Sequence, residues 1–531
     1  MKLKMVDSLN SICYNHFNAT GCDKFLLPEV QMKTYGILKK ITASLLGASL
    51  LISMLASCGS SPDNNSVGSP ATTVETSAAA NAETSAQRLY ADVPSDAFYD
   101  GYKFTLLLSG NWDFDDFTAD ELDGEPINDA IYQRNSIIEE KYGVEIAVNI
   151  MTEQGSKGSD AFKNSVMAGD NAFDAAMMGS YEVSALAYND YLIDLNKIPY
   201  LDLTKPWWDQ KANADLSMKG IMYYTTGSIT TLLNDCTYCI LFNKTLINNY
   251  GMDNPYELVY SGGWTLDKFA SMTMQVSEDI DGSGTFDSND KYGAIIWDDS
   301  MLGMVSAIGE KVCSIKPDGE IELTLYNDRV VSILDRYLTL VLDKQHCIRV
   351  DPGNDISIPM FSSDRALFYT RYLRAVSWFR DMTTDFGVLV YPKYDENQED
   401  YYTNVHAYGS SFVCIPKSNN NTERTGILLE AIAAESLYLI QPAYYEITLV
   451  GKYTRDDESV AMLDMLISNR VYDVGLYYQV GTYNEQLMNL FRKGKNEFVS
   501  MYQKYENKAL DTIDTINEAF SAAAGVGNAA S

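Results

Sequence analysis

The chain has 531 residues, 46% of them hydrophobic and 21% charged, and its 40 basic against 72 acidic residues give a net charge of −32. This apolar fraction can fill sizeable cores, so disorder over most of the chain is excluded, and the length predicts roughly two to four domains. The strongly acidic balance repels nucleic-acid phosphates and anionic lipid headgroups, which excludes either as a partner bound through a broad electrostatic surface. Three histidines and eight scattered cysteines leave little material for a His-rich or Cys-rich metal site.

A targeting signal is predicted over residues 32–57. Three lysines between positions 33 and 40 precede an apolar run and a group of small residues, which is the order of a secretory signal. The apolar run falls short of the roughly 20 residues that span a bilayer, so it indicates a targeting signal rather than a membrane domain. The sequence Leu-Ala-Ser-Cys that ends at Cys58 resembles the lipobox of bacterial lipoproteins, in which the cysteine is lipidated. An ordinary secretory peptide that happens to contain a cysteine is the alternative.

Three other segments are set apart from the folded body. Residues 1–31 precede the signal and are interpreted as a mis-annotated upstream extension, with translation starting at Met32. Residues 58–96 begin with a Ser-, Thr-, Ala- and Asn-rich stretch that cannot bury enough apolar surface to offset its ordering entropy, which predicts a flexible tether. The bland tail 521–531 is expected to fray.

From about Phe98 the pattern alternates between strand and helix. The predicted elements are strand 103–109, helix 127–142 ended by Gly143, strand 144–150, a helix near 160–168 and a strand in 173–178. The first helix is expected to bury Ile131, Ile137 and Ile138. This order predicts a parallel sheet covered by helices, whose ligands sit at the carboxyl ends of the strands.

The second half of the chain continues in mixed order before it becomes mainly helical. The predicted elements are strand 236–242, a helix from Lys244 to about Tyr250, a helix with N-cap Thr265, strand 366–369, helix 375–383, strand 386–391 and mostly helix over 423–498. No internal repeat is found.

Several of these passages resemble the extracellular solute-binding lipoproteins of bacterial ABC importers, in particular the carbohydrate-associated group related to maltose-binding protein. They are the strand 236–242 followed by Asn243-Lys244 and by Trp264-Thr265 at a helix start, Lys205-Pro-Trp-Trp-Asp209, Phe386-Gly-Val-Leu-Val-Tyr-Pro-Lys393 and Gly451-Lys-Tyr-Thr-Arg455. The resemblance covers about 100–520, and no single motif in it is decisive.

The resemblance implies an α/β, two-lobed periplasmic-binding-protein-like fold that closes on its ligand by a hinge motion. It implies a non-enzymatic, monomeric receptor on the outer face of the cell membrane, held there only by its lipid anchor, that delivers a carbohydrate to ABC permease subunits. The boundaries that follow are an N-terminal lobe over 97–234, a hinge crossing over 235–242, a C-terminal lobe over 243–390, and a return crossing with a shared helical remainder over 391–520.

Candidate ligand residues are aromatic and charged side chains near predicted strand ends. Sugar rings pack their C–H faces on flat aromatic rings, and their hydroxyls need fixed polar partners. The candidates are Trp112, Tyr181, Trp207, Trp208, Asp235, Tyr369, Arg371 and Tyr445. The resemblance implies an acidic sugar-binding residue at Asp235 and a stacking aromatic at Tyr369. A packing role is the alternative for each of them.

An acidic loop over 279–290 has the spacing of a twelve-residue calcium loop. Its candidate ligands are Asp279, Asp281, Ser283, Asp287 and Asp290, with the backbone carbonyl of Thr285. Asp290 replaces the usual longer glutamate, which makes bidentate closure less certain. Calcium here would be structural, because the loop wraps its ligands around one point; a solvated acidic turn is the alternative.

Two other functions stay open at this point. A surface glycosidase needs two carboxylates roughly 5 to 10 Å apart, and an acidic chain always offers candidates. A receptor for a peptide or another solute is the third possibility. Cys236 and Cys239 would point to opposite faces of a strand, so they are not expected to pair. Cys313, Cys347 and Cys414 are expected to be buried apolar groups, and oxidation of a close pair in an exported protein is the alternative.

Overall fold

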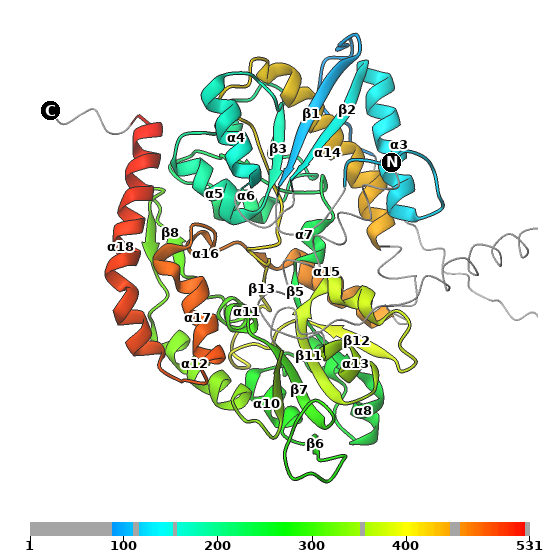
Figure 1. The fold of residues 1–531 in the computed structure, drawn as a ribbon, viewed down its shortest axis with the longest axis vertical. Coiled ribbons are helices and arrows are strands. Elements are labelled where there is room, and N and C mark those ends of the chain that lie inside the picture. Colours follow the sequence, from blue (N-terminus) through cyan, green and yellow to red (C-terminus); the bar gives the residue numbers. More distant parts are fainter. Residues whose placement is uncertain (1–87, 110–115, 152–156, 351–355, 446–456, 526–531) are drawn as a thin grey trace, which may run out of the picture. The chain divides into compact units, whose positions relative to one another are not determined.

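A five-stranded sheet, ordered β2-β1-β3-β14-β4, forms the centre of the first lobe (Figure 1).

The computed structural model describes residues 88–109, 116–151, 157–350, 356–445 and 457–525. All of these belong to one compact unit, Ala86–Ser531, and the other unit, Met1–Ser85, lies outside them. The predicted extension, signal peptide, lipidation residue Cys58 and most of the tether therefore fall outside the described residues, as does the end of the tail.

The strands of this first sheet follow the predicted βαβαβ order. They are β1 (Tyr102–Ser109), β2 (Val144–Met151), β3 (Ala175–Met178), β4 (Tyr224–Thr225) and β14 (Phe412–Cys414). β1 pairs in parallel with both β2 and β3, with Leu106 opposite Ala175, and β14 is antiparallel to β3. All four residues of the central strand β3 are apolar and buried, as is typical of a parallel strand whose sheet is covered on both faces by helices.

Helices enclose this sheet. They are α3 (Pro126–Tyr142), α4 (Lys157–Ala168), α5 (Ser180–Tyr188), η1 (Leu195–Lys197), α6 (Gln210–Leu216), α7 (Leu232–Asp235) and α14 (Thr422–Tyr445). α3 ends at Gly143, whose φ of 60° and ψ of 48° are left-handed, as predicted. Ile131 and Ile138 are buried, but Ile137 is 40% exposed, so its predicted burial is wrong. The apolar stripe of α3 is narrower than its sequence suggests.

A second sheet, ordered β10-β7-β11-β5-β12 with β6 paired to β7, forms the centre of the second lobe (Figure 1). Its strands are β5 (Tyr238–Asn243), β6 (Ser277–Glu278), β7 (Lys291–Trp297), β10 (Cys347–Val350), β11 (Ala366–Tyr372) and β12 (Phe386–Leu389). β7 is parallel to β10 and β11, whereas β5 is antiparallel to β11 and β12. The carboxyl ends of β7 and β11 therefore meet at the edge where β5 begins.

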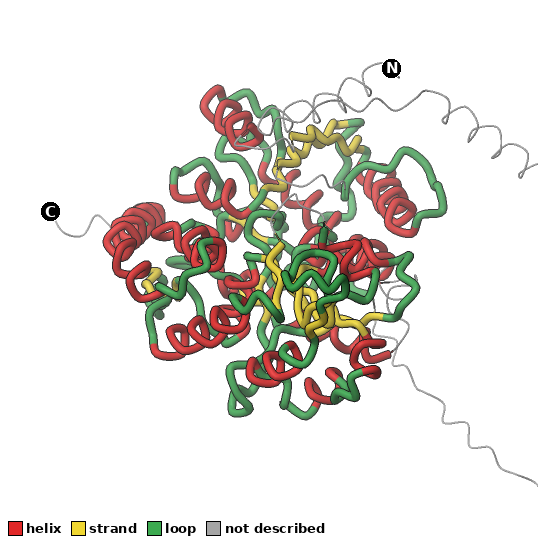
Figure 2. The backbone as a smooth tube through the Cα atoms, turned by 60° about the horizontal axis from the view of Figure 1, so that its bottom comes forward, coloured by secondary structure: helices red, strands yellow, loops and turns green. Residues whose placement is uncertain are grey.

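The second lobe is also covered by helices, which lie outside its strands in Figure 2. They are α8 (Lys244–Asn249), α9 (Pro255–Tyr260), α10 (Leu266–Thr273), α11 (Ser300–Ala307), α12 (Asp328–Val341), α13 (Ser357–Ser362) and η2 (Leu373–Phe379), with the small β8 (Cys313–Ile315) and β9 (Ile321–Leu323) hairpin. Thr265 caps α10 by accepting a hydrogen bond from the Lys268 amide, as predicted. The predicted helix 375–383 is instead the 3-10 segment η2.

The chain passes between the two sheets more than once. It enters the second sheet at β5, returns to the first at β14, and then packs α15 (Asp457–Ser468) against β12. The pair β13 (Thr403–Asn404) and β15 (Arg470–Val471) lies on these passages. The predicted first crossing, 235–242, contains the last residue of α7 and most of β5.

The last elements, α16 (Val474–Tyr477), η4 (Val480–Thr482), α17 (Tyr483–Arg492) and α18 (Phe498–Ala523), complete the body. α18 contacts α5 of the first lobe and both α12 and β9 of the second, so it runs along both lobes (Figure 1). The predicted two-lobed α/β fold is confirmed. No helix among the described residues is both long and apolar enough to cross a bilayer.

Candidate functional site

Six aromatic side chains form a continuous group at the edges where the two sheets face each other. This central aromatic cluster consists of Tyr181, Tyr238, Trp297, Tyr372, His406 and Tyr408. Tyr181 follows β3 in the first lobe, Trp297 and Tyr372 end β7 and β11 in the second, and His406 lies on the return passage. Ligands of parallel sheets bind at these carboxyl ends, so the fold places the cluster where a ligand is expected.

The rings are arranged as a chain of contacts from one lobe to the other. Tyr238 stacks on Trp297 with centroids 5.9 Å apart, and Tyr372 stacks on His406 at 5.7 Å. Tyr408 then contacts His406 at 6.2 Å and Tyr181 edge-on at 6.3 Å. Tyr408 is 40% exposed and Tyr181 is partly exposed, whereas the other four rings are buried. The cluster therefore presents ring surface to solvent at its Tyr181–Tyr408 end.

Arg371 lies over the second-lobe end of the cluster. Its guanidinium carbon is 4.1 Å from the Trp297 ring centroid, 4.7 Å from that of Tyr372 and 5.2 Å from that of Trp378. A guanidinium is attracted to the negative faces of aromatic rings at such distances. Arg371 is partly exposed, whereas the last residue of β11, Tyr372, is buried.

Two carboxylates directly follow Trp297 at the end of β7, and each is paired. Asp299 accepts from Nε2 of His406 at 2.8 Å and from the Tyr238 hydroxyl at 3.3 Å. Asp298 is fully buried and pairs with Arg492 of α17. Burial and the Asp299 charge raise the pKa of Asp298, against the opposing effect of Arg492. These pairs tie the second sheet to the return passage and to α17.

Buried polar atoms without partners gather at the same place. The indole nitrogen of Trp297, the Nε of Arg371 and the Oδ1 of Asn484 are buried with no hydrogen-bond partner among the described residues. The amide nitrogen of Asn484 donates to the Tyr181 hydroxyl at 3.0 Å, which places Asn484 against the cluster. Each such atom costs about 1 to 3 kcal/mol, and ligand hydroxyls are groups that can satisfy them.

The sequence-predicted ligand residues do not all lie here. Tyr181 and Arg371 are in or against the cluster. Trp207 and Trp208 are 0% and 1% exposed, and the Trp208 indole donates to Glu430 at 2.9 Å. A Cβ at Gly227 would lie 2.2 Å from the Trp207 carbonyl oxygen, so this loop is packed tightly against a glycine. In this arrangement neither indole offers a free ring face to a ligand.

Tyr369 is likewise enclosed. It is 1% exposed, packs between Phe361 and Phe379, and shares a hydrogen bond with Ser357 at 3.0 Å. Alternation along β11 puts it on the face covered by α13 and η2. Its surroundings are those of a core residue, which agrees with the packing alternative for this position.

Asp235 and Tyr445 lie at the ends of α7 and α14. Asp235 accepts a hydrogen bond from Tyr444 at 2.9 Å, and burial raises the pKa of Asp235 to about 6 despite that bond and the Arg374 charge. Tyr445 is partly buried, and burial raises its pKa. The remaining candidate, Trp112, lies outside the described residues.

Two pockets lie away from the cluster. One of about 160 Å³, below the roughly 300 Å³ of ordinary ligand pockets, is lined by residues that include Trp207, Trp208, Asn234, Gln441 and Arg470. Arg470 already donates to Asn234 and to Thr237 there. A second pocket of about 610 Å³ lies between α5 and the end of α18 and contains none of the predicted ligand residues.

Sequence reasoning missed Trp297, Asp298, Asp299 and His406. The first three had a usable signal, because an aromatic residue and two carboxylates directly follow the apolar run of β7. His406 had none, since it lies in an irregular segment and reaches the cluster only through the return of the chain. The five described cysteines are buried, as expected, and none of them forms a disulfide with another described cysteine.

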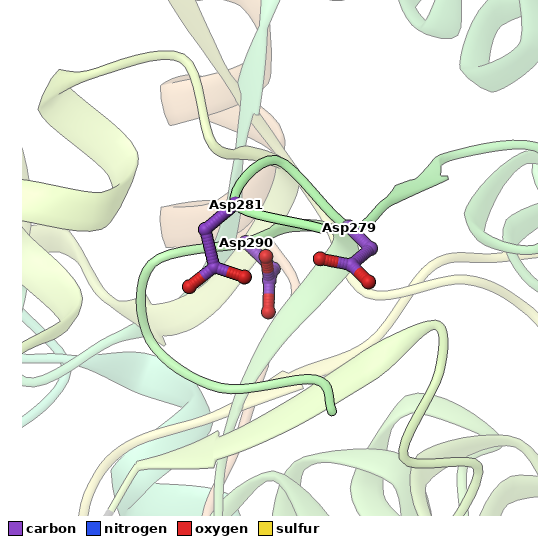
Figure 3. Close-up of side chains that lie close together, drawn as sticks. All are labelled: Asp279, Asp281 and Asp290. Atoms are coloured by element: carbon purple, nitrogen blue, oxygen red, sulfur yellow. The ribbon is translucent and has the colours of Figure 1, made fainter. Parts of the chain in front are cut away.

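The acidic loop gathers three of its predicted calcium ligands (Figure 3). Carboxylate oxygens of Asp279, Asp281 and Asp290 lie within 4.8 Å of one another. The Ser283 amide donates to both Asp279 and Asp281, and the fully buried Asp290 accepts from the amides of Ile280 and Asp287. Oxygen donors at this spacing fit a hard divalent cation.

The described fold is similar to those of several solved binding proteins, two of which are described as parts of ABC transporters. The galacto-N-biose-/lacto-N-biose I-binding protein from Bifidobacterium longum, in complex with lacto-N-biose, matches with 13% identity over 79% of this chain and 98% of its own, at a TM-score of 0.54. UgpB from Mycobacterium tuberculosis, in complex with glycerophosphocholine, matches with 13% identity over 78% and 98%, at 0.52. A solute-binding protein from Thermotoga lettingae, bound with alpha-D-tagatose, matches with 16% identity over 78% and 100%, at 0.50.

At these identities the likeness shows that the chain has the two-lobed fold of these proteins. No protein-family model matches the chain, and no curated protein matches its sequence.

Proposed function

We propose that the protein is the substrate-binding component of an ABC importer and captures a saccharide between its two lobes. The observation that carries this function is the central aromatic cluster, which both lobes build at the edges where their sheets face each other. Flat rings with nearby unpaired polar atoms suit a sugar, whose C–H faces stack and whose hydroxyls form hydrogen bonds. The solved neighbours that hold lacto-N-biose and tagatose support this ligand class.

Closure of the lobes supplies the mechanism. Tyr181 belongs to the first lobe, Trp297 and Tyr372 to the second, and His406 and Tyr408 to the passage between them. A ligand that touches both lobes binds the closed form better than the open form, so it shifts the equilibrium toward closure. The closed form would then present a joint surface to the permease. No group transfer is required, so the role is that of a receptor rather than an enzyme.

Titration with saccharides tests this function. The purified protein should show a higher melting temperature with at least one oligosaccharide, and the ligand should be recovered intact by mass spectrometry. Tyr408→Ala should weaken binding about tenfold or more, because an exposed ring of the cluster is lost. Tyr260→Ala, on the 54%-exposed Tyr260 of α9, is the matched control and should bind like the parent. Product formation would indicate a glycosidase, and stabilisation by peptides alone would indicate a peptide receptor.

We also propose that the loop 279–290 binds calcium as a structural ion. Asp279, Asp281 and Asp290 would supply carboxylate ligands, with Ser283, Asp287 and the Thr285 carbonyl completing the set. Binding to the folded state alone stabilises it by about 2.7 kcal/mol at a hundredfold excess over Kd, so the melting temperature should rise with calcium.

A matched pair of variants tests the ion. Asp281→Ala should abolish the calcium-dependent rise, because it removes a ligand. Asp318→Ala should keep it, since Asp318 is another exposed turn aspartate, which accepts a hydrogen bond from the Glu320 amide. Equal melting temperatures of the parent in calcium and in chelator would contradict the proposal.

The location follows from the amino-terminal segment and the importer role. We propose that a lipid on Cys58 holds a monomer on the extracellular face of the cell membrane, beside the permease. Two acyl chains, at about 0.8 kcal/mol per buried methylene, anchor firmly, whereas one does not. Cys58→Ala should move the protein from the membrane fraction to the medium. Retention of this variant after a high-salt wash would contradict the anchor.

A further inference from the structure

We propose that Arg371 makes this receptor specific for saccharides that carry an anionic group, a carboxylate or a sulfate. The proposal rests on the function above and names the substrate class of the same site. Among the described residues, Arg371 lies on the cluster without a charged partner. Its guanidinium sits over Trp297, Tyr372 and Trp378 at the second-lobe end, at 4.1 to 5.2 Å from the three ring centroids.

The absence of a partner is unusual in this chain. Acidic residues outnumber basic ones 72 to 40, so an arginine finds a carboxylate easily. Within the described part of the chain, the Arg371 side chain makes no ion pair and no hydrogen bond, and its Nε is buried. By contrast, Arg329 and Arg336, which also lie over an aromatic ring, that of Tyr394, are both paired with carboxylates.

The two carboxylates that follow the neighbouring strand β7 are already paired. Asp298 pairs with Arg492, and Asp299 with His406 and the Tyr238 hydroxyl. Both carboxylates at the end of β7 therefore already have a partner. The aromatic walls hold the guanidinium in place without neutralising it, because a cation over a ring keeps its full charge.

A guanidinium that is charged and has no partner favours the binding of a ligand that carries an anionic group. The guanidinium presents its N–H donors in a planar fork that matches a carboxylate or sulfate, and charge-assisted hydrogen bonds are about twice as strong as neutral ones. The overall charge of −32 does not prevent this, since salt at about 0.15 M screens charges beyond about 8 Å.

Calorimetric titration with matched saccharides tests the proposal. The probes are oligogalacturonates, their methyl esters with the same carbon skeleton but no charge, and sulfated and unsulfated galacto-oligosaccharides of equal length. The parent should bind one charged member at least tenfold more tightly than its uncharged counterpart, the range expected for one charge-assisted contact being about ten- to a hundredfold. The two charged series separate a carboxylate from a sulfate as the recognised group.

Variants assign the preference to Arg371. Arg371→Gln should reduce the ratio of neutral to anionic Kd to about one, and Arg371→Lys should leave an intermediate ratio because it keeps the charge but loses the fork. Arg336→Gln is the matched control and should keep the parent's ratio. The ratio is compared within each folded variant, so a loss of stability does not mimic the effect.

The outcomes separate this inference from the function on which it rests. If the parent binds neutral saccharides as tightly as anionic ones, or Arg371→Gln keeps the preference, Arg371 does not select for anions and the receptor function stands. If no saccharide of either kind binds the parent, the proposed function itself is wrong and this inference falls with it.

Discussion

Two regions of the molecule place a charged group among tryptophans, and they treat it in opposite ways. In the first lobe, Glu430 is 1% exposed beside Trp208, and burial raises its pKa to about 7. At the edge of the second lobe, Arg371 lies over Trp297 and Trp378 but stays partly exposed. Full burial penalises a charge, so the carboxyl moves toward its neutral form, whereas a partly exposed guanidinium keeps its charge.

The comparison separates packing from recognition. The tryptophans around Glu430 are enclosed, so their removal should change stability. The rings around Arg371 lie at the junction of two lobes, so the removal of an accessible one should change binding. The largest expected effects are on stability, and the smaller ones are on affinity and on single hydrogen bonds.

Trp208→Ala should lower the free energy of unfolding by about 3 to 5 kcal/mol, the usual cost of deleting a buried tryptophan. It also removes the indole donor to Glu430. Denaturant unfolding measures the loss, and calorimetry on the folded fraction should show nearly parental affinity. A large loss of affinity with parental stability would put Trp208 in the ligand site and remove the contrast between the regions.

Glu430→Gln should flatten part of the pH dependence of stability. The folded-state pKa of about 7 exceeds the ordinary 4.5, so the folded state binds this proton more tightly than the unfolded state. The resulting stabilisation is complete below pH 4.5 and is lost as the pH rises toward about 7, a change of about 3 kcal/mol.

Relative to the parent, the glutamine variant should therefore gain about that much between pH 4.5 and pH 7.5, because it has no proton to lose. Denaturant unfolding at several pH values measures the difference in stability. In the Glu430→Gln variant, the amide oxygen of the glutamine can still accept a hydrogen bond from the Trp208 indole. A constant difference at all pH values would mean that Glu430 titrates normally.

Trp378→Ala should weaken binding of an anionic saccharide by about 1 to 2 kcal/mol, because one wall that holds the Arg371 guanidinium is lost. The partly exposed side chain fills little core, so stability should fall far less than in Trp208→Ala. Titration and unfolding of both variants, side by side, measure the contrast. Equal stability losses in the two would show that both regions are packing alone.

Tyr181→Phe should have the smallest effect, a loss of about 1 kcal/mol of stability, because it removes one hydrogen bond, from Asn484, and keeps the ring. Affinity should stay close to parental if stacking is the role of Tyr181. A tenfold loss of affinity would assign the contact to the hydroxyl instead, which would sharpen the description of the first-lobe side of the cluster.

Local patterns predicted much of the fold. β1, α3, β2, α4 and β3 lie close to their predicted ranges, and Gly143 and Thr265 end and begin helices as expected. The main errors are at η2, which is a 3-10 segment rather than an α-helix, and at Ile137, which is exposed. Such details depend on neighbours that are distant in sequence.

The candidate ligand residues were harder to predict, because aromatic side chains pack in protein cores and also stack on sugars. Trp207 and Trp208 were predicted as ligand residues because they lie on a Pro-containing loop. In the structure this loop packs against Gly227 and Glu430. Tyr369 and Arg371 share a face of β11, but only Arg371 lies at the strand end, beyond the cover of α13. The buried Tyr369 and the candidate ligand residue Arg371 are therefore only two residues apart along the same strand.

The α/β class, the order of most strands and helices, and the close approach of the acidic side chains in loop 279–290 could be predicted from the sequence, because each depends on spacing among near neighbours. The tertiary structure alone decided that Tyr181, Trp297, Tyr372 and His406 meet, since they come from different lobes and from the passage between them. It also decided which charged groups stay unpaired. Burial and pairing depend on the whole set of packed neighbours, and no local pattern records that set.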